Sequence, residues 1–481
     1  MTESELLKTD KTLSGRRQIF TSVKKITAEN IVEVLNKAFV KHAQNAAEIR
    51  FLFNYYKGIQ PILRRTKEIR PEINNKVVEN HAAEIVSFKT GYVFGSPIQY
   101  VRRGNKDVHM QNADSIIMLN EMMFEENKAS KDKELGETML ICGTAYRIAF
   151  PKRKSEGISG FDILQPSPDK CFVIYQNDIY KKPVLGVTYT VDDETGKTLI
   201  RAYTDKDVFT LSGTEFGVSE LVKVDRNGIG IQPVIEYVNN SARMGCFENV
   251  IPLLDAINIS TSDRINDIAQ FVQNLIWFHN VDIDSEGFEK LRQSGGIKTK
   301  SPAGNAQAII KFLTSQLDQN GAQTVKDDLY QTVLQIAGVP DRNASTGGNT
   351  GQAILLASGW QTAESHARET ELTFIGSEKE FLRVVLKILS NSRDAPEIMK
   401  NLAISDVGVK FSRNRTDNML TKTQGLLNML EAGIAPETAI ANCEMFSDPA
   451  QVAADSVEFM NKWRELKQTQ ANNNPQNIKE E

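Results

Sequence analysis

The chain has 481 residues, which is enough for two or three structural units with a sizeable core. Hydrophobic residues make up 40% of it and charged residues 25%, as in an ordinary soluble globular protein. The net charge of −4 argues against a protein that grips nucleic acid through its phosphates, because such domains are usually strongly basic.

Membrane and export signals are missing from the sequence. No apolar run is long enough to span a bilayer, and the polar N-terminus MTESELLKTDK lacks the core of a signal peptide. The 4 cysteines are widely spaced and form no CxxC pair, which is typical of free thiols in a reducing compartment. We therefore expect an intracellular protein without a membrane span.

The N-terminal part of the chain predicts helices and one short strand. Apolar residues recur at helical intervals over residues 27–56, with Thr27 as the N-cap and Gly58 placed to end the helix. A second helix is expected over 75–90, stopped by Gly91. A strand at 98–101 and helices at 114–128 and 131–142 complete this part.

Between Tyr146 and Val238 the pattern changes to alternation with a period of two, which predicts strands. The runs are 146–150, 171–175, 185–191, 198–203, 208–211 and 234–238. The acidic cluster at 192–196 lies between two of them. It is better explained as a solvated hairpin turn, with Gly196 at positive φ, than as a cation site.

The second half of the chain is mostly helical in pattern. A helix is expected over 248–276, and a mixed insertion rich in Gly and Lys follows at 277–312. The next helix, 315–337, ends before Gly338-Val-Pro340. Further elements are a long helix at 353–392 with possible bends at Gly359 and Gly376, a strand at 407–412, and helices at 418–431, 436–445 and 449–466. The tail from Lys467 is expected to be disordered.

The helix at 248–276 is predicted to be packed on one side and wet on the other. Its apolar face consists of Val250, Leu254, Ile257, Ile265, Ile268, Val272 and Leu275. The opposite face carries Asp263, Asn266, Gln270 and Asn274. Acidic residues outnumber basic ones both here and in 315–340, which suits a surface past which DNA slides. An ordinary acidic surface explains the same charges equally well.

No motif for catalysis or for metal binding is complete. The glycine-rich loop 341–351 fails the phosphate-binding pattern, because Gly347 and Gly351 are one residue too close and Gln352 stands where a Lys is needed. The run 282–287 resembles the start of a calcium loop, but Gln293 occupies the position of the bidentate Glu. The histidines lack zinc-ligand spacing. We therefore expect no enzyme activity, no cofactor and no metal.

Six blocks, in order over about three hundred residues, resemble those of a known family. They are Tyr55-Tyr-Lys-Gly58, Asn74-Asn-Lys-Val-Val-Glu-Asn-His81, Thr90-Gly-Tyr-Val-Phe-Gly-Ser-Pro97, Gln232-Pro-Val-Ile-Glu-Tyr-Val-Asn-Asn240, Ile251-Pro-Leu-Leu-Asp-Ala-Ile-Asn258 continuing through Ser262-Asp-Arg-Ile-Asn-Asp267, and Gly348-Asn-Thr-Gly-Gln-Ala-Ile354. The chain resembles the portal (head–tail connector) proteins of tailed bacteriophages, of the siphovirus type.

The resemblance implies a predominantly helical α+β fold assembled as a ring of about twelve subunits at one capsid vertex, through which double-stranded DNA enters and leaves. It divides the chain into regions named wing, stem, clip and crown. These are wing 1–245 and 352–415, stem helices 246–276 and 315–340, clip 277–314, tunnel loop 341–351, crown 416–466 and a disordered tail 467–481.

The resemblance also assigns site residues, none of them catalytic. The tunnel loop would touch DNA through Arg342, Asn343, Ser345, Thr346 and Asn349. The stem would face the channel with Asp263, Asn266, Gln270 and Asn274, and the clip would bind partners through Asp284, Lys298 and Lys300. Glycines give such a loop the mobility to follow a duplex that does not share the symmetry of the ring.

The implied partners are further copies of the chain as a dodecamer, non-specifically bound double-stranded DNA, the large terminase subunit, the head–tail connector or adaptor, the scaffold and the major capsid protein, but no membrane. The implied location is the virion, with the host cytoplasm during assembly. Two alternatives remain: a nucleotide-dependent enzyme of DNA packaging, and a minor structural head protein without a channel.

Overall fold

The computed structural model describes residues 13–68, 70–103, 113–152, 158–272, 275–279, 309–313, 319–341, 359–412, 419–443, 445–446 and 452–457, with positions 286, 289, 449, 459 and 461. Two compact units are present. The first consists of Met1–Phe53, Val86–Cys246 and Ala363–Glu481, and the second of Asn54–Ile85 and Phe247–Thr362. Each unit therefore draws on segments that are distant in the sequence.

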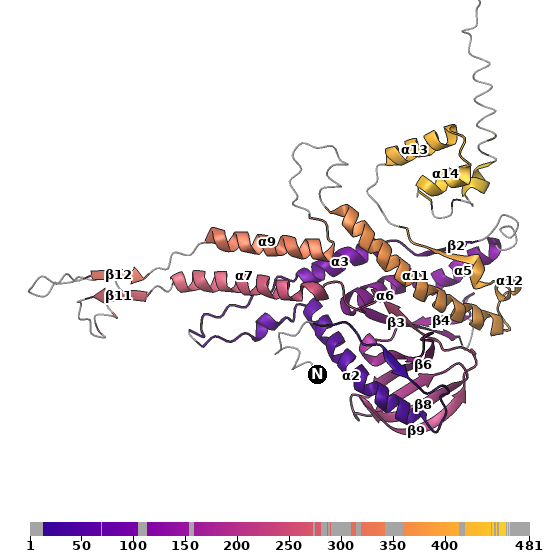
Figure 1. The fold of residues 1–481 in the computed structure, drawn as a ribbon, viewed down its shortest axis with the longest axis horizontal. Coiled ribbons are helices and arrows are strands. Elements are labelled where there is room, and N and C mark those ends of the chain that lie inside the picture. The colour runs from indigo at the N-terminus through magenta and orange to yellow at the C-terminus, as the bar shows by residue number, and fades with distance from the viewer. Residues whose placement is uncertain are drawn as a thin grey trace, which may run out of the picture. The chain divides into compact units, whose positions relative to one another are not determined.

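The first unit contains a six-stranded sheet in the order β1-β5-β6-β7-β8-β9. Its strands are β1 (Ile19–Thr21), β5 (Cys171–Gln176), β6 (Pro183–Val191), β7 (Thr198–Tyr203), β8 (Asp207–Thr214) and β9 (Gly217–Arg226). β1 pairs with β5 in parallel and the other pairs are antiparallel. Helix α2 (Ile31–Tyr56) packs on this sheet, with Leu35 and Phe39 buried against Phe172 and its neighbours (Figure 1).

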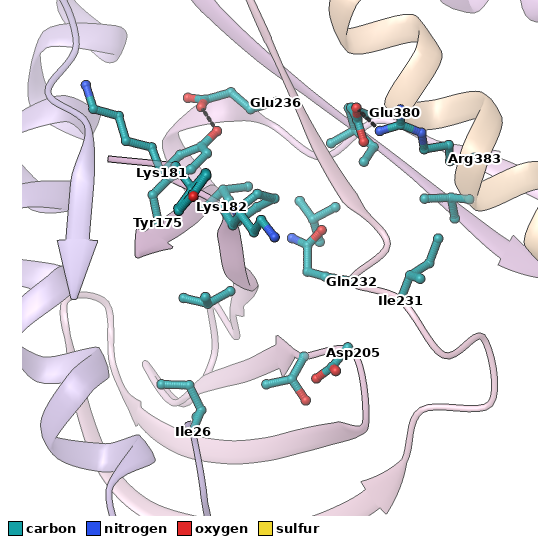
Figure 2. A pocket seen from close by; sticks show the side chains of 18 of the residues that line it. Ile26, Tyr175, Lys181, Lys182, Asp205, Ile231, Gln232, Glu236, Glu380 and Arg383 are labelled. Carbon is teal, nitrogen blue, oxygen red and sulfur yellow. Dashed lines mark hydrogen bonds and ion pairs between the residues drawn. The ribbon is translucent and has the colours of Figure 1, made fainter. Parts of the chain in front are cut away.

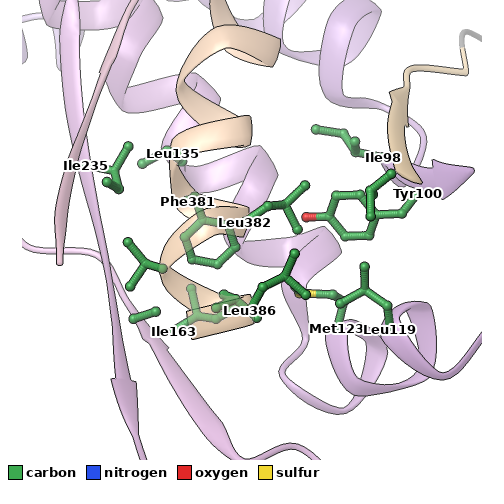
Figure 3. Close-up of a cluster of buried hydrophobic side chains, with 14 of the residues drawn as sticks. Ile98, Tyr100, Leu119, Met123, Leu135, Ile163, Ile235, Phe381, Leu382 and Leu386 are labelled. Carbon is green, nitrogen blue, oxygen red and sulfur yellow. The ribbon is translucent and has the colours of Figure 1, made fainter. Parts of the chain in front are cut away.

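A second core of the same unit surrounds the long helix α11 (Trp360–Asn391). The elements around it are α5 (Ala113–Glu125), α6 (Lys128–Cys142), α12 (Glu397–Lys400), the sheet β10-β3-β4 (Val234–Val238, Thr144–Pro151, Phe161–Leu164) and the pair β13-β2 (Val407–Lys410, Gln99–Arg102). Figure 3 shows Phe381, Leu382 and Leu386 of α11 packed among side chains from these elements. Burial of this apolar face, at roughly 25 cal/mol per Å², positions the helix.

The second unit is built on two helices that lie side by side, α7 (Ile251–Val272) and α9 (Gln319–Ala337) (Figure 1). Between them in the chain, β11 (Leu275–His279) and β12 (Ile309–Leu313) form an antiparallel pair. Gly338, at φ +65°, follows the end of α9. The remaining described elements of the chain are α3 (His81–Phe94), α13 (Met419–Glu431), α14 (Pro436–Cys443), and the short helices η1 (Pro61–Arg64), η2 (Pro168–Lys170), η3 (Glu248–Val250) and η4 (Ile404–Asp406).

Most of the predicted elements are confirmed. The six predicted strand runs fall in β3, β5, β6, β7, β8 and β10. The predicted turn at 192–196 is a hairpin turn with Gly196 at φ +66°, and all 4 cysteines are free. The mixture of helices and sheets agrees with the expected α+β class. Residues 353–358, much of 449–466 and the tail from Lys467 lie outside the described residues.

Three predictions of helix extent were wrong. The helix expected over 248–276 does not reach its predicted end, because Leu275 and Ile276 belong to strand β11. The helix expected at 75–90 is α3, which begins at His81 and continues through Gly91 to Phe94. Residues 75–80 are not helical, because backbone N–H groups of this segment donate hydrogen bonds to side chains of α7 instead of to carbonyl groups of a helical turn. The helix expected over 353–392 is not continuous: α11 begins at Trp360, and Gly359 precedes it at φ +84°. Strands β1, β4 and β9 and the β11–β12 pair were not predicted.

Candidate functional site

A row of polar side chains on α7 binds the extended segment 75–79 within the second unit. Asn258, Ser262 and Asn266 are each no more than 1% exposed. Their oxygens accept hydrogen bonds from three backbone N–H groups. The donors are Glu79 to Asn258 at 2.8 Å, Val77 to Ser262 at 3.0 Å and Asn75 to Asn266 at 2.6 Å. We call these three side chains the polar ladder.

The spacing of the polar ladder matches the spacing of an extended chain. Its members are four residues apart on a helix, which gives a rise of about 6 Å between successive rungs. The bonded N–H groups are two residues apart on an extended segment, which is about 6.6 Å. Helix and segment therefore stay in register over three rungs. Each of these three N–H groups obtains an acceptor that a neighbouring strand would otherwise supply.

The prediction of which α7 face is buried was wrong beyond its first turns. Leu254 and Ile257 are buried as expected, but Ile265 is 39% exposed and Ile268 is 52% exposed. Asn266, predicted to face water, is buried. Apolar periodicity fails here because hydrogen bonding to another backbone segment selects the buried face. The i, i+4, i+8 spacing of Asn258, Ser262 and Asn266 was the sequence signal that could have revealed it.

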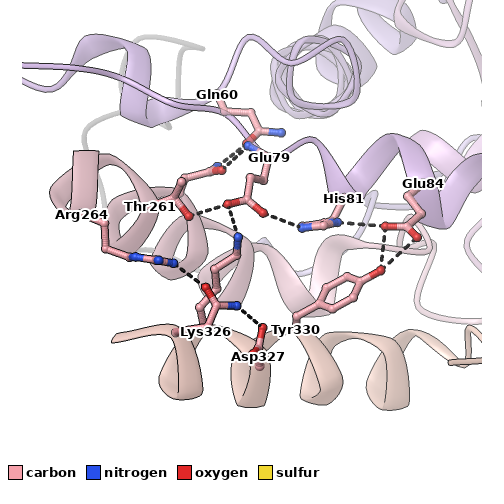
Figure 4. Close-up of polar contacts among 11 residues, drawn as sticks. Gln60, Glu79, His81, Glu84, Thr261, Arg264, Lys326, Asp327 and Tyr330 are labelled. Atoms are coloured by element: carbon pink, nitrogen blue, oxygen red, sulfur yellow. Dashed lines mark hydrogen bonds and ion pairs between the residues drawn. The ribbon is translucent and has the colours of Figure 1, made fainter. Parts of the chain in front are cut away.

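Charged residues join the extended segment to both helices (Figure 4). Glu79 accepts from Lys326 of α9 at 2.7 Å and from Thr261 of α7 at 2.5 Å. Burial raises the pKa of Glu79, but the bonds from Lys326 and Thr261 outweigh it, so this pKa lies below its ordinary value. His81 lies 2.9 Å from Glu84, whose carboxylate also accepts from the Tyr330 hydroxyl of α9. The network fixes α9 against the segment.

The only cations within α7 and α9 are engaged inside the unit. Arg264 is the one basic residue of α7, and its Nη1 donates to Gln323 of α9 at 2.6 Å. Lys326 is the one basic residue of α9 and is bound by Glu79. Asp327 and Asp328 are exposed on α9. The described helix pair thus presents acidic side chains to solvent, while its two basic side chains bind other residues of the same unit.

Asp263 and Asp255 have different surroundings on α7. The Asp263 side chain is 40% exposed and lies 2.8 Å from Arg65, so its charge is partly compensated. Asp255 is partly buried and accepts from the Tyr55 hydroxyl at 2.9 Å. Burial raises the pKa of Asp255 to about 6, against the opposing effect of the hydrogen bond from Tyr55. Asp255 is therefore a carboxyl group that titrates close to neutral pH.

Most of the other predicted site residues lie outside the described part of the chain. These are Arg342, Asn343, Ser345, Thr346 and Asn349 of the predicted loop, Asp284, Lys298 and Lys300 of the insertion, and Asn274. The run 282–287 also falls there, apart from Glu286. Gln270 lies within α7. The structure therefore brings together only Asp263 and Asn266 of the predicted set, on neighbouring positions of one helix.

Within the described residues, no group of three or more His, Cys, Asp or Glu side chains is arranged to hold a metal ion. None of the helices in that part of the chain is long and apolar enough to cross a membrane. The chemistry of the helix pair is that of a scaffold. It offers buried amide and hydroxyl acceptors, internally matched charges and exposed isoleucines.

Comparison with known proteins identifies the chain. The family model described as "Phage portal protein, SPP1 Gp6-like" matches residues 36–474, which is most of the sequence. A search of curated proteins found no match. The family match covers both units, including α7, α9 and the extended segment between η1 and α3. The chain therefore belongs to the phage portal protein family, whose members are structural proteins of the capsid and of DNA packaging.

Proposed function

We propose that this portal protein closes into a ring of about twelve subunits with α7 and α9 as the stem around a DNA channel. Residues 1–245 and 352–415 would form the wing, 277–314 the clip and 416–466 the crown. In this arrangement the protein has no catalytic role. It binds DNA transiently and without sequence preference, at the capsid vertex of the virion and, during assembly, in the host cytoplasm.

The stem assignment is supported by the observation that the basic residues of α7 and α9 are bound within the helix pair. Rows of Lys and Arg would hold DNA by releasing counterions from the phosphates, and each such contact strengthens binding. Arg264 and Lys326 are instead bound inside the helix pair, while Asp327 and Asp328 stay exposed. A wall of this kind repels the duplex weakly and lets it slide.

Exposed isoleucines and valine on the same helices support assembly into a ring. Ile259 is 46% exposed, Ile265 39% and Ile268 52% on α7. Val325 is 57% exposed and Ile336 49% on α9. Large apolar side chains at this density on one helix pair are typical of a surface that a partner covers. In a closed ring each subunit meets two neighbours, which gives both sides of the pair a partner.

Two further parts of the proposal concern residues outside the described chain. The loop 341–351 would contact phosphates through Arg342, Asn343, Ser345, Thr346 and Asn349. The clip would dock the large terminase subunit and then the head–tail connector through Asp284, Lys298 and Lys300. The wing and crown would contact the scaffold and the major capsid protein. The polar, glycine-rich composition of the loop supports transient contact, because only Arg342 is a cation.

The ring is tested by imaging the purified protein. Negative-stain particles should show a central hole and about twelvefold symmetry. The change Ile265→Asp with Ile268→Asp should leave the subunit folded by circular dichroism but reduce it to monomers, because carboxylates cannot be buried unpaired at a subunit contact. Phe124→Asp, which changes a side chain 88% exposed in the first unit, is the matched control and should keep the ring. Monomers of the unmodified chain under assembly conditions would contradict the proposal.

The loop and the clip have their own tests. Shortening Gly347–Gly351 should leave rings intact and impair DNA packaging or retention. Normal packaging by that variant would remove the loop from the channel. Lys298→Glu with Lys300→Glu should weaken binding of the terminase or connector and spare the ring. Unchanged binding of both partners would remove the clip assignment.

A further inference from the structure

The six-stranded sheet of the first unit has ends of opposite charge. Because β6, β7 and β8 are antiparallel neighbours, the turns at 177–182 and 204–206 lie at one end and the turn at 192–197 lies at the other. In these turns Lys181, Lys182 and Lys206 outnumber Asp178 and Asp205 at the first end. At the second end Asp192, Asp193 and Glu194 outnumber Lys197. We call the second end the acidic tip.

The basic end opens into a pocket of about 920 Å³, bounded by the two turns and by α11 (Figure 2). Lys24 and Lys25 join the three lysines of the turns in lining it. Two carboxylates in its wall are already paired: Glu236 with Arg243, and Glu380 with Arg383. Asp205 and Asp207 are the other acidic residues of the wall. Lysines therefore outnumber the acidic side chains that remain to balance them.

Two donors inside this pocket lack an acceptor. The Nε2 of Gln232 is buried and has no hydrogen-bond partner among the described residues. Figure 2 shows the nitrogen ends of Gln232 and Lys182 pointing toward one another. Within that same part of the chain, Lys182 has no carboxylate within ion-pair distance, although it lies over the Tyr180 ring at 5.7 Å. A buried donor without a partner costs about 1–3 kcal/mol, so an incoming carboxylate would be favoured here.

The pocket is held in shape by its backbone. The Asp178 carboxylate accepts from the N–H groups of Tyr180 and Lys181 at 2.9 and 2.8 Å, and Lys181 has the left-handed φ of 46°. A Cβ on Gly186 would lie 2.2 Å from Gln232 Nε2, so that glycine makes room for the amide. The turn backbone and the space for the Gln232 amide are thus formed before any ligand arrives, which reduces the ordering entropy of binding.

The acidic tip is a turn held by its own hydrogen bonds. Asp192 uses its own carboxylate to accept from the N–H groups of Glu194 and Thr195 at 2.9 and 3.2 Å, and Gly196 donates to the Asp192 carbonyl at 2.8 Å. Asp193 and Glu194 are exposed and, within the described chain, lie in no ion pair. Their carboxylates are consequently available at the end of a fixed turn.

We propose that the acidic tip of one subunit docks in the basic pocket of the next subunit. The inference rests on the proposed ring, which requires two different, complementary surfaces on every copy of the chain. A basic hollow and an acidic projection at opposite ends of one sheet meet that requirement. Asp193 and Glu194 would bind the lysines of the pocket and the Gln232 amide. A DNA duplex is disfavoured as occupant, because the apolar residues Ile26, Val184 and Ile231 also line the hollow.

Charge exchange tests the contact directly. The pocket variant is Lys182→Glu with Lys206→Glu, and the tip variant is Asp193→Lys with Glu194→Lys. Asp192 is kept because the turn needs it. In each variant, like charges face one another across the contact. The affinity of each subunit contact should therefore fall on the order of tenfold or more, and sedimentation velocity should show smaller species in place of rings. One chain carrying all four changes should form rings again.

Mixing provides a second, independent measurement. The pocket variant has an acidic tip and an acidic pocket, whereas the tip variant has two basic surfaces. Neither should form rings alone, but an equimolar mixture should form rings of alternating subunits. Lys41→Glu with Lys133→Glu, two exposed lysines of the same unit, is the charge-matched control and should assemble normally. Assembly of the unmodified ring should also weaken as salt is raised, because the contacting charges are screened.

The outcomes separate this contact from the ring itself. If the unmodified chain forms rings and either variant does too, the tip–pocket contact is wrong while the portal ring stands. Failure of the four-change chain and of the mixture to restore rings would also overturn it. If the pocket variant forms rings but is not incorporated into procapsids, the pocket takes an acidic segment of another capsid protein. If the unmodified chain forms no ring, both proposals are wrong.

Discussion

Arg147 and Asp132 form an ion pair in the interior of the first unit, with Arg147 Nη2 2.6 Å from Asp132 Oδ1 and side chains 0% and 4% exposed. Lys128 lies 2.6 Å from Asp132 and 3.0 Å from Glu378 of α11. Arg147 also lies 3.3 Å from Glu378, so two cations and two carboxylates form one buried cluster. Burial raises the pKa of Glu378, but the charges of Lys128 and Arg147 outweigh it and hold this pKa below its ordinary value.

The four charges balance, so removing one should cost more than removing a matched pair. Glu378→Gln leaves two buried cations with one carboxylate and should lower the free energy of unfolding by about 3–5 kcal/mol. Adding Lys128→Met restores the balance and should recover part of that loss. Urea unfolding of both single variants and of the double variant forms a double-mutant cycle. Additive losses would show that the four residues do not act as a unit.

The same cluster shows what the sequence could and could not reveal. Lys128 and Asp132 are four residues apart on a helix, a pattern that solvated helix faces share. Glu378 lies in a charged stretch of the long helix and shows no distinguishing feature. Arg147 alone was informative, because it interrupts the apolar run 146–150. Local periodicity predicted the helices and strands. It could not predict that Glu378 pairs with Arg147, because the two residues are more than 200 positions apart in the sequence.

The polar ladder gives a second prediction. Ser262→Ala would leave the N–H of Val77 without its acceptor, and Asn266→Ala would do the same to Asn75. Because these hydrogen bonds are part-buried, each change should destabilise the second unit by about 0.5–1.5 kcal/mol. Amide hydrogen exchange should accelerate at residues 75–79 ahead of the first unit. Thr324→Ala, which removes an exposed hydroxyl bonded to the Asn320 carbonyl, is the control. Equal exchange in all three proteins would mean that the ladder does not hold the segment.

Asp255 predicts a stability change near neutral pH. Folding raises its pKa from 3.8 to about 6, so protonated Asp255 favours the fold. That contribution is fully present below pH 3.8 and is lost as the pH rises through 6. Asp255→Asn should therefore stabilise the protein at pH 7.5, by at most about 3 kcal/mol, and give no advantage at pH 3.5. The melting temperature of both proteins across this range provides the measurement. A constant difference at every pH would exclude Asp255 as the titrating group.

His42 predicts the opposite dependence in the first unit. The centroid of its ring lies 4.4 Å from that of Phe172, with the two rings tilted by 30°, and its Nε2 lies 3.0 Å from the Asp169 carbonyl oxygen. Burial lowers the pKa of His42 from 6.5 to about 4, although the bond to Asp169 raises it. Stability from the neutral ring is present above pH 6.5 and is lost as the pH falls toward 4, at most about 3 kcal/mol. His42→Gln should be less stable at pH 8 but should lose less stability between pH 6.5 and 4.

In the proposed ring, a new free cation on α9 should slow the passage of DNA. Asp328 is exposed on α9, where Lys326 is already bound by Glu79. Asp328→Lys places about twelve additional ammonium groups around a ring, and each one that reaches a phosphate strengthens binding through counterion release. Packaging in vitro should fall at low salt and recover as salt screens the contacts. Asp328→Asn removes the same carboxylate without adding a cation and should package nearly as the unmodified protein does. If Asp328→Lys packages normally at low salt, this face of α9 does not look onto the DNA, and Asp267 on α7 becomes the position to change next.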